Sequence, residues 1–179
     1  MIRFFLLILC LSLINFNTST KEIGSSTGYK IPRFVSIKSD EANLRIGSSK
    51  NYPIILQYKI KDMPVEIIDE YENWRKIIDI EGNQGWMHKS LLKGNRFAII
   101  KNKKNLNTQF FSKPNGHIIG EIGKLNIVKI KRCLQKWCLV SKNDIKGWVI
   151  KKDLWGVYKN EKINVPFYQP LISFYWSIF

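Results

Sequence analysis

The chain has 179 residues and carries 29 Lys or Arg against 14 Asp or Glu, which gives a formal net charge of +15 at pH 7. A field of that sign attracts anionic partners. The sequence contains two histidines, no glycine-rich phosphate loop and no cluster of metal ligands, so we predict no catalytic residue, no metal site and no cofactor.

Residues 1–20 predict a secretory signal peptide. A short basic start, Met1-Ile2-Arg3, precedes an apolar run from Phe4 to Phe16 and a small polar stretch from Asn17 to Thr20. The alternative is an uncleaved membrane anchor, but the run is shorter than the ~20 apolar residues that a spanning helix needs. We therefore expect an exported protein of the periplasm or cell envelope, with no transmembrane span in its mature chain.

The rest of the chain divides into a leader, two repeats and a tail. Residues 21–33 are rich in glycine, serine and threonine and predict a flexible leader. Residues 34–94 and 95–156 repeat one pattern, and two units of about 60 residues favour two small domains over one large enzyme core. The matched positions, at an offset of 62 or 63 residues, are Asn43/Asn105, Leu44/Leu106, Trp74/Trp137, Gly85/Gly147, Trp86/Trp148 and Gly94/Gly156.

Each repeat has the pattern of β structure. Met63–Asp69 and Trp74–Ile80 are short runs rich in β-branched residues, and Glu81-Gly82-Asn83 is a hairpin signal. No long segment shows a helical period, so helices are expected only as single turns, at 89–92 and 151–154. Short strands with regular turns predict an all-β chain of small barrels or sandwiches.

The two repeats differ in charge. Residues 34–94 hold nine basic and nine acidic side chains, whereas residues 95–156 hold fourteen basic and three acidic ones, a net charge of +11. We expect the second repeat to attract peptidoglycan or another anionic envelope component. Nucleic acid is the usual partner of so basic a domain, but predicted export makes it unlikely. The alternative is a solvated basic face without a partner.

Cys133 and Cys138 are the two cysteines of the predicted mature chain, and an even pair in an exported protein suggests a disulfide. Val128, Ile130 and Leu139 alternate with polar neighbours, as in two strands of a hairpin, so the cysteines would face each other near its tip. Free thiols are the alternative. A metal site is a weaker one, because no second ligand pair stands nearby.

The tail, residues 157–179, carries no charged side chain after Lys162. Pro166 and Pro170 argue against one continuous helix. The tail is too short to span a membrane, so it either docks on a barrel or forms an exposed patch for a partner or a membrane interface. Pairing of 172–178 as an extra strand is a further alternative. The aromatic residues after Lys162 are Phe167, Tyr168, Phe174, Tyr175, Trp176 and Phe179.

Repeat one resembles the bacterial SH3-like (SH3b) family. The resemblance rests on Ala42-Asn43-Leu44-Arg45 with the small turn residues after it, on Trp74 at the head of a strand, and on Gly85-Trp86 before the closing Leu92. It implies tandem SH3-like β-barrels. It also implies a binding module, since such domains often target cell-wall peptides or position a wall hydrolase.

Repeat two resembles a variant of this family in exported proteobacterial proteins, in which a cysteine pair brackets a tryptophan, here Trp137. Gly147-Trp148 then matches the end of the domain. One departure concerns the opening motif, where Asn107 takes the place of Arg45 and Gln109-Phe110-Phe111 that of the small turn. A ligand surface built from this strand would be altered in repeat two.

The aromatic residues divide into a predicted core and a predicted contact surface. Trp74, Trp86, Trp137 and Trp148 are predicted to be structural core, because one buried tryptophan supplies a large share of a small barrel's apolar burial. The alternative for these four is an aromatic groove for an extended peptide. The candidate ligand-contact residues, in the opening motif or in predicted loops, are Arg45, Tyr52, Tyr58, Tyr71, Phe110 and Phe111.

These features predict a non-catalytic protein. His88 and His117 stand in a closing segment and a turn, and neither lies near a cysteine or paired carboxylates in the sequence. We expect a cell-envelope module that binds peptidoglycan or a wall-associated ligand. The alternatives are an adaptor that binds an envelope protein and an accessory targeting subunit of a wall hydrolase.

Overall fold

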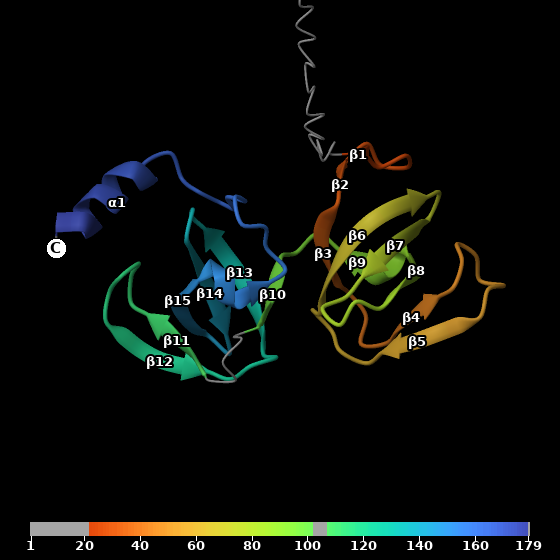
Figure 1. Ribbon diagram of the computed structural model, residues 1–179, viewed down its shortest axis with the longest axis horizontal. Helices are drawn as coiled ribbons and strands as arrows, with labels where there is room; N and C mark the ends of the chain where they lie inside the picture. Colours follow the sequence, from red (N-terminus) through yellow and green to blue (C-terminus); the bar gives the residue numbers. More distant parts are fainter. Residues whose placement is uncertain (1–21, 102–106, 179) are drawn as a thin grey trace, which may run out of the picture.

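The computed structural model describes residues 22–101 and 107–178. The predicted signal peptide lies outside them, as do Asn105 and Leu106 of the opening motif of repeat two. The chain forms two seven-stranded antiparallel sheets, each curled into a small barrel, which lie side by side in Figure 1. The all-β prediction with two tandem SH3-like barrels is confirmed.

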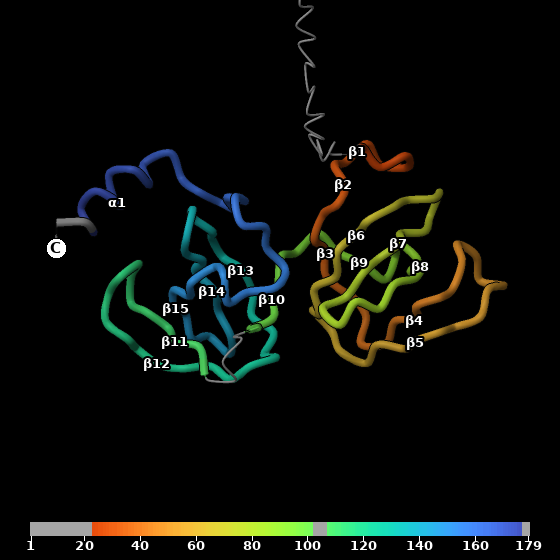
Figure 2. Tube along the Cα trace, in the orientation of Figure 1, coloured from red at the N-terminus to blue at the C-terminus, as the bar shows by residue number. Residues whose placement is uncertain are grey.

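The two barrels have the same strand order, which Figure 2 lets the reader trace along the chain. The order is β5-β4-β8-β7-β6-β3-β9 in the first barrel and β12-β11-β15-β14-β13-β10-β16 in the second. The first barrel consists of β3 (Arg33–Ile37), β4 (Ala42–Arg45), β5 (Ile54–Tyr58), β6 (Pro64–Tyr71), β7 (Trp74–Ile78), β8 (Gln84–His88), a 3-10 turn (Lys89–Leu91) and β9 (Leu92–Lys93). The second consists of β10 (Phe97–Ile100), β11 (Thr108–Phe111), β12 (Ile118–Ile122), β13 (Ile127–Cys133), β14 (Trp137–Lys142), β15 (Ile145–Ile150), a 3-10 turn (Lys151–Asp153) and β16 (Leu154–Trp155).

The interior of each barrel is mainly aliphatic. Alternate residues of each strand point inward, as the period of two requires. In the first barrel Leu44, Ile77 and Met87 are fully buried, and in the second Val140 and Val149 are. A β-bulge in β6 and another in β13 bend these long strands, which helps each sheet to curl.

The predicted disulfide between Cys133 and Cys138 is confirmed. The two residues are direct partners across β13 and β14, with their Cα atoms 4.1 Å apart and their sulfurs bonded. Both are fully buried in the second core, so the bond fastens the tip of this hairpin to the barrel interior.

The segment predicted to be a flexible leader forms a hairpin instead. Strands β1 (Glu22–Ile23) and β2 (Lys30–Ile31) pair, and the turn between them closes over Glu70 of the first barrel. The Glu70 carboxylate accepts hydrogen bonds from the backbone N–H of Ser26 (3.2 Å) and from the hydroxyl of Thr27 (2.9 Å). The prediction was wrong because a turn rich in small polar residues gains order from a buried carboxylate that lies far away in sequence.

The matching of the two repeats in the sequence is wrong at their second strands. Arg45 pairs with Trp86 across the first sheet, and Phe111 pairs with Trp148 across the second. The residue of the second barrel that corresponds to Arg45 is therefore Phe111, 66 residues later, and not Asn107 as the sequence predicted. The segment predicted as a turn at 109–111 is part of strand β11.

The tail forms a helix longer than the single turns that the sequence predicts. Helix α1 runs from Gln169 to Ile178, and Pro170 stands in its first turn. Backbone N–H groups of the first turn have no acceptor within a helix, so proline is tolerated there. Before the helix, the chain follows the second barrel, where Ile163 bridges to Cys133 and exchanges two backbone hydrogen bonds with it. The tail thus docks on the second barrel.

Aromatic side chains join the two barrels. The ring of Phe34, in β3, lies 5.1 Å from that of Trp155 and 4.8 Å from that of Tyr158, measured between centroids. The Tyr158 hydroxyl donates a 2.6 Å hydrogen bond to Glu66 of the first barrel. Burial, together with the neighbouring Glu66 carboxylate, raises the pKa of Tyr158, so its hydroxyl stays protonated and able to donate.

Candidate binding groove

The four tryptophans at matched places lie on the outer faces of the sheets. Met87 belongs to the first core, so its neighbour Trp86 points to the opposite face, and the same alternation in β15 places Trp148 outside the second core. Trp74 and Trp148 are nevertheless buried, whereas Trp86 and Trp137 are half-buried. The prediction of a structural core role is therefore wrong for Trp86 and Trp137, because aliphatic residues at alternate positions fill these small interiors.

A groove of about 270 Å³ opens on this outer face of the first barrel. Trp74 lines it, and the imidazole of His88 stands edge-to-face against the indole, with the ring centroids 5.4 Å apart. The strands β4, β7 and β8, the loop after β4 and the 3-10 turn after β8 supply its walls. The lining residues are Asn43, Arg45, Lys50, Trp74, His88, Ser90 and Leu91.

The position of His88 follows from the turn that it begins. Trp74 and His88 are direct cross-strand partners in β7 and β8, so their side chains share one face of the sheet. His88 is also the N-cap of the 3-10 turn, and its Nδ1 accepts from the backbone N–H of Ser90 and lies 2.7 Å from the Ser90 hydroxyl. This capping holds the imidazole at the edge of the groove.

The loop after β4 brings a second cation to the rim. Arg45 donates from Nη1 to the carbonyl oxygen of Tyr52 at 2.6 Å, which closes the loop. The ring of Tyr52 lies over Gly47, where an added Cβ would stand 2.5 Å from the ring, so the loop needs glycine there. Folded in this way, the loop places Lys50 in the groove wall.

The chemistry of the groove suits an anionic end of a small extended ligand. Arg45 and Lys50 supply positive charge, Asn43 and Ser90 supply hydrogen-bonding groups, and Trp74 supplies an apolar surface. Within the described residues, no carboxylate lines the groove. A carboxylate here would meet charge-assisted donors, while a short aliphatic group would pack on the indole.

Three of the six predicted contact residues lie at or near this groove. Arg45 lines it, and Tyr52, 48% exposed, accepts a hydrogen bond from Arg45 through its backbone carbonyl. Tyr71 is the cross-strand partner of Trp74 and is 54% exposed, so it extends the same face beyond the groove. These positions agree with a contact surface, and their part in binding stays a prediction.

The other predicted contacts are not exposed loop residues. Tyr58 ends strand β5 and is buried in the first core. Its hydroxyl donates a 2.9 Å hydrogen bond to Asp79. Phe110 is buried in the second core, where its ring packs against Gly147. Phe111 is half-buried and packs edge-to-face on Trp137, with centroids 5.1 Å apart. The contact predictions for Tyr58 and Phe110 are wrong, because both are inward-facing strand residues.

Sequence reasoning missed Asn43, Lys50, His88, Ser90 and Leu91 as groove residues. It favoured a structural core role for Trp74, with an aromatic groove as the alternative. The alternation of β4 could have found Asn43, two residues before Arg45 and hence on the same face. Lys50 carried no such signal, because its place depends on how the loop folds back.

In the second barrel the corresponding face is covered by helix α1. The indole of Trp176 packs edge-to-face on Trp148, with centroids 5.6 Å apart. Gln169, at the start of the helix, is buried and accepts a 2.9 Å hydrogen bond from Arg132 of β13. The two barrels therefore differ on this face. Trp176 packs on Trp148, the counterpart of Trp86, and Phe111 packs on Trp137, the counterpart of the groove residue Trp74.

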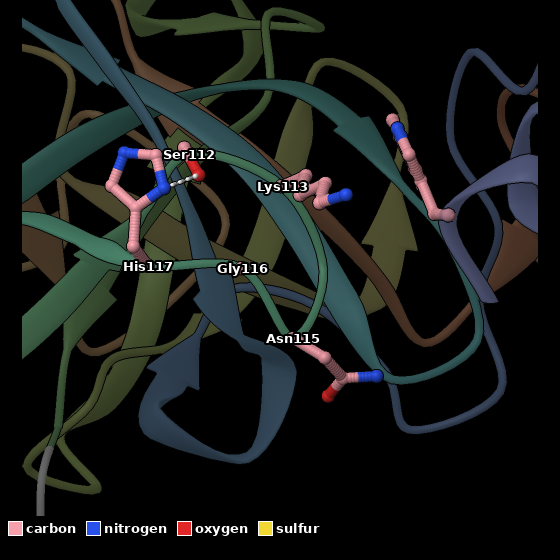
Figure 3. Close-up of a pocket in the computed structure, with 6 residues that line it drawn as sticks. Ser112, Lys113, Asn115, Gly116 and His117 are labelled. Atoms are coloured by element: carbon pink, nitrogen blue, oxygen red, sulfur yellow. Dashed lines mark hydrogen bonds between the residues drawn. The ribbon is translucent and has the colours of Figure 1, made fainter. Parts of the chain in front are cut away.

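A wider cavity of about 690 Å³ lies between Trp176 and the turn that joins β11 to β12. Figure 3 shows that the labelled side chains of this turn spread in different directions, with Asn115 and His117 pointing away from each other. His117 accepts from or donates to Ser112 at 3.2 Å, which is a contact within the turn. We therefore do not assign a ligand to this cavity.

Across the described ranges, no group of three or more His, Cys, Asp or Glu side chains is arranged to hold a metal ion. In the same part of the chain, no helix has the length and apolar character needed to cross a bilayer.

Comparison with known proteins identifies the first barrel. Residues 38–94 match the family model described as bacterial SH3 domain, so this segment is a bacterial SH3 domain, and the second barrel repeats its strand order. No curated protein matches the chain.

Several solved structures are similar to the chain at low identity. NlpC1 from Trichomonas vaginalis is 13% identical, with 74% of this chain and 48% of that chain covered and a TM-score of 0.33. An NlpC/P60 family protein from Bacillus cereus ATCC 10987 is 14% identical over 78% and 61% of the two chains, with a TM-score of 0.31. Endolysin LysPBC5 CBD is 15% identical over 68% and 90%, with a TM-score of 0.29. The chain spans about half the length of the first of these, and TM-scores of this size support no argument about function.

Proposed function

We propose that this protein is a non-catalytic binding module of the cell envelope, and that the groove of its first barrel binds a carboxylate-bearing peptide of peptidoglycan. The observation that carries the proposal is the groove itself, which is lined by the indole of Trp74 and by the cationic side chains of Arg45 and Lys50. Its volume fits one or two small residues at the end of a peptide rather than a large ligand.

Two further features support this function. The buried disulfide is typical of proteins in an oxidising compartment, which agrees with the predicted export. The net charge of +11 on residues 95–156 would draw the molecule toward an anionic wall before the groove engages its ligand. In this account charge speeds the encounter, and the groove supplies selectivity.

Co-sedimentation with purified peptidoglycan across a salt series tests the proposal. The protein is used without residues 1–20, because the apolar run of the predicted signal peptide would itself adhere to surfaces. We expect binding that weakens with salt but persists when surface charges are screened. The double variant Arg45→Gln/Lys50→Gln should lose the salt-resistant part.

The matched control is Lys129→Gln/Lys146→Gln, which removes the same charge from two exposed lysines of the second barrel. This control should lower binding only at low salt. Equal loss in both variants would reduce the interaction to general electrostatic adhesion. No sedimentation at any salt would contradict wall binding and favour an envelope protein as partner.

A further inference from the structure

One side of helix α1 holds it to the second barrel. Gln169, Ile172 and Trp176 recur at helical spacing, and Gln169 and Trp176 contact Arg132 and Trp148 of the barrel. This docking fixes which side of the helix faces away from the protein.

The side that faces away is formed by large apolar residues. Leu171 is 74% exposed, Phe174 68% and Tyr175 58%, and Phe167, just before the helix, is 94% exposed. Positions 171, 174 and 175 fall on one side of the helix at 3.6 residues per turn, and Phe167 precedes its first turn. The chain from residue 163 to 179 carries no charged side chain, so nothing on the helix opposes contact with an apolar phase. A contiguous patch of this kind marks an interaction surface.

The net charge of the second barrel indicates what covers this surface. Lys113 lines the cavity next to Trp176, and the carbonyl oxygen of Lys131 accepts from Asn164 where the tail leaves the barrel. Both lysines belong to the repeat with a net charge of +11. An apolar helical face on a domain with this positive charge is suited to the interface of an anionic membrane.

We propose that Phe167, Leu171, Phe174 and Tyr175 enter the interface of an anionic lipid bilayer, with Lys113 and Lys131 at the headgroups. A ten-residue helix is about 15 Å long, half of what a span requires, so α1 lies in the plane of the interface. Lipid binding is separate from the proposed wall binding, since it uses a different barrel and different side chains.

Vesicle co-sedimentation tests this surface, again with the protein lacking residues 1–20. The probes are vesicles of phosphatidylglycerol and phosphatidylcholine at 1:3 and vesicles of phosphatidylcholine alone. We expect binding to the anionic vesicles and much weaker binding to the neutral ones. Phe167→Ser/Leu171→Ser should lower the partition coefficient by about tenfold or more, and Lys113→Gln/Lys131→Gln should weaken only the binding to anionic vesicles.

The control Ile46→Ser/Ile60→Ser removes two exposed apolar side chains, 63% and 53% exposed, from the first barrel, and it should bind as the parent does. Phe167→Ser alone is a second test, because this residue precedes the helix and its loss leaves the helix intact. Unchanged vesicle binding in the Phe167 and Leu171 variants would overturn the proposal. Absence of vesicle binding together with self-association that the same variants abolish would assign the surface to a second copy of the chain.

Discussion

Glu70 shows how a single buried charge orders a distant segment. Its carboxylate is fully buried, forms ion pairs with Arg33 and Arg75, and accepts from Ser26 and Thr27 of the β1–β2 hairpin. Burial alone would raise the pKa of Glu70, but the hydrogen bonds from Arg33 and Thr27 and the charge of Arg75 outweigh it and lower the pKa below 4.5. The ionised form therefore stabilises the folded state.

This network predicts a pH dependence of stability. Because the folded pKa of Glu70 is lowered, its contribution is complete above the ordinary value of 4.5 and is lost as the pH falls through the folded value. Glu70→Ala should cost about 3 kcal/mol at pH 7, since it leaves two arginines without their partner. Chemical denaturation between pH 7 and pH 3 checks this, and the variant should show a flatter profile. If the free energy of unfolding of the variant depended on pH as that of the parent does, Glu70 would not be a source of this pH dependence.

The disulfide makes a second prediction about individual residues. Reduction of Cys133–Cys138 should lower the free energy of unfolding by about 2 kcal/mol, toward the low end for such bonds because the enclosed loop is short. Denaturation with and without dithiothreitol measures this change. Cys133→Ser/Cys138→Ser is the matched control and should not respond to the reductant. An unchanged free energy of unfolding of the parent protein in dithiothreitol would mean that the disulfide makes no measurable contribution to stability.

Helix α1 is the element that distinguishes the two barrels. Its contact with Trp148 covers the face that stays open around Trp86 in the first barrel. Trp176→Ala should cost about 1 kcal/mol, the usual value of an aromatic pair, and should expose Trp148 to solvent. Quenching of tryptophan fluorescence by iodide should then increase despite the loss of one indole. Unchanged quenching would show that Trp148 is shielded without the helix.

The elements also show what the sequence could and could not reveal. Strand runs, the hairpin turn and the cysteine pair were visible because they depend on local spacing. The matching of Arg45 to Asn107 failed because the connection before β11 is longer than the one before β4, which shifts the strand along the sequence. The dipeptide Asn105-Leu106 repeats Asn43-Leu44 but stands before the strand and not within it. Burial alternation gives the correct match, since Ala42 and Leu44 point inward as Thr108 and Phe110 do.

The candidate groove was only partly predictable for a related reason. Arg45 and Tyr52 were identified from the opening motif and its loop, but Trp74 was assigned to the core. A tryptophan at a strand head gives no local sign of the face on which it lies, until its partner His88 is known. Lys50 reaches the groove through the fold of a loop, which spacing in the sequence does not determine.

At the scale of the whole molecule, the two barrels are joined by a short connection and by an aromatic contact. Phe34 and Glu66 of the first barrel meet Trp155 and Tyr158 of the second. The turn between Trp155 and Tyr158 depends on Gly156. Its φ of 114° and its close approach to the carbonyl oxygen of Phe97 exclude a side chain.

This contact predicts that the barrels unfold together. Scanning calorimetry of the parent should show one cooperative transition, with equal calorimetric and van't Hoff enthalpies. Phe34→Ala/Tyr158→Ala should uncouple the barrels and give two transitions, whereas Tyr158→Phe, which removes only the hydrogen bond to Glu66, should keep one. Two transitions already in the parent would contradict energetic coupling.

The central claim is that the first barrel binds the carboxylate end of a wall peptide in the groove over Trp74. The most direct measurement is a titration of the ¹⁵N-labelled protein with a soluble peptidoglycan stem peptide, followed through the indole N–H signals. We predict that the Trp74 signal shifts with saturable dependence on peptide, that the Trp148 signal stays unchanged, and that Arg45→Gln/Lys50→Gln abolishes the shift. Shifts confined to the second barrel, or no shift at any peptide concentration, would contradict the assignment of this groove.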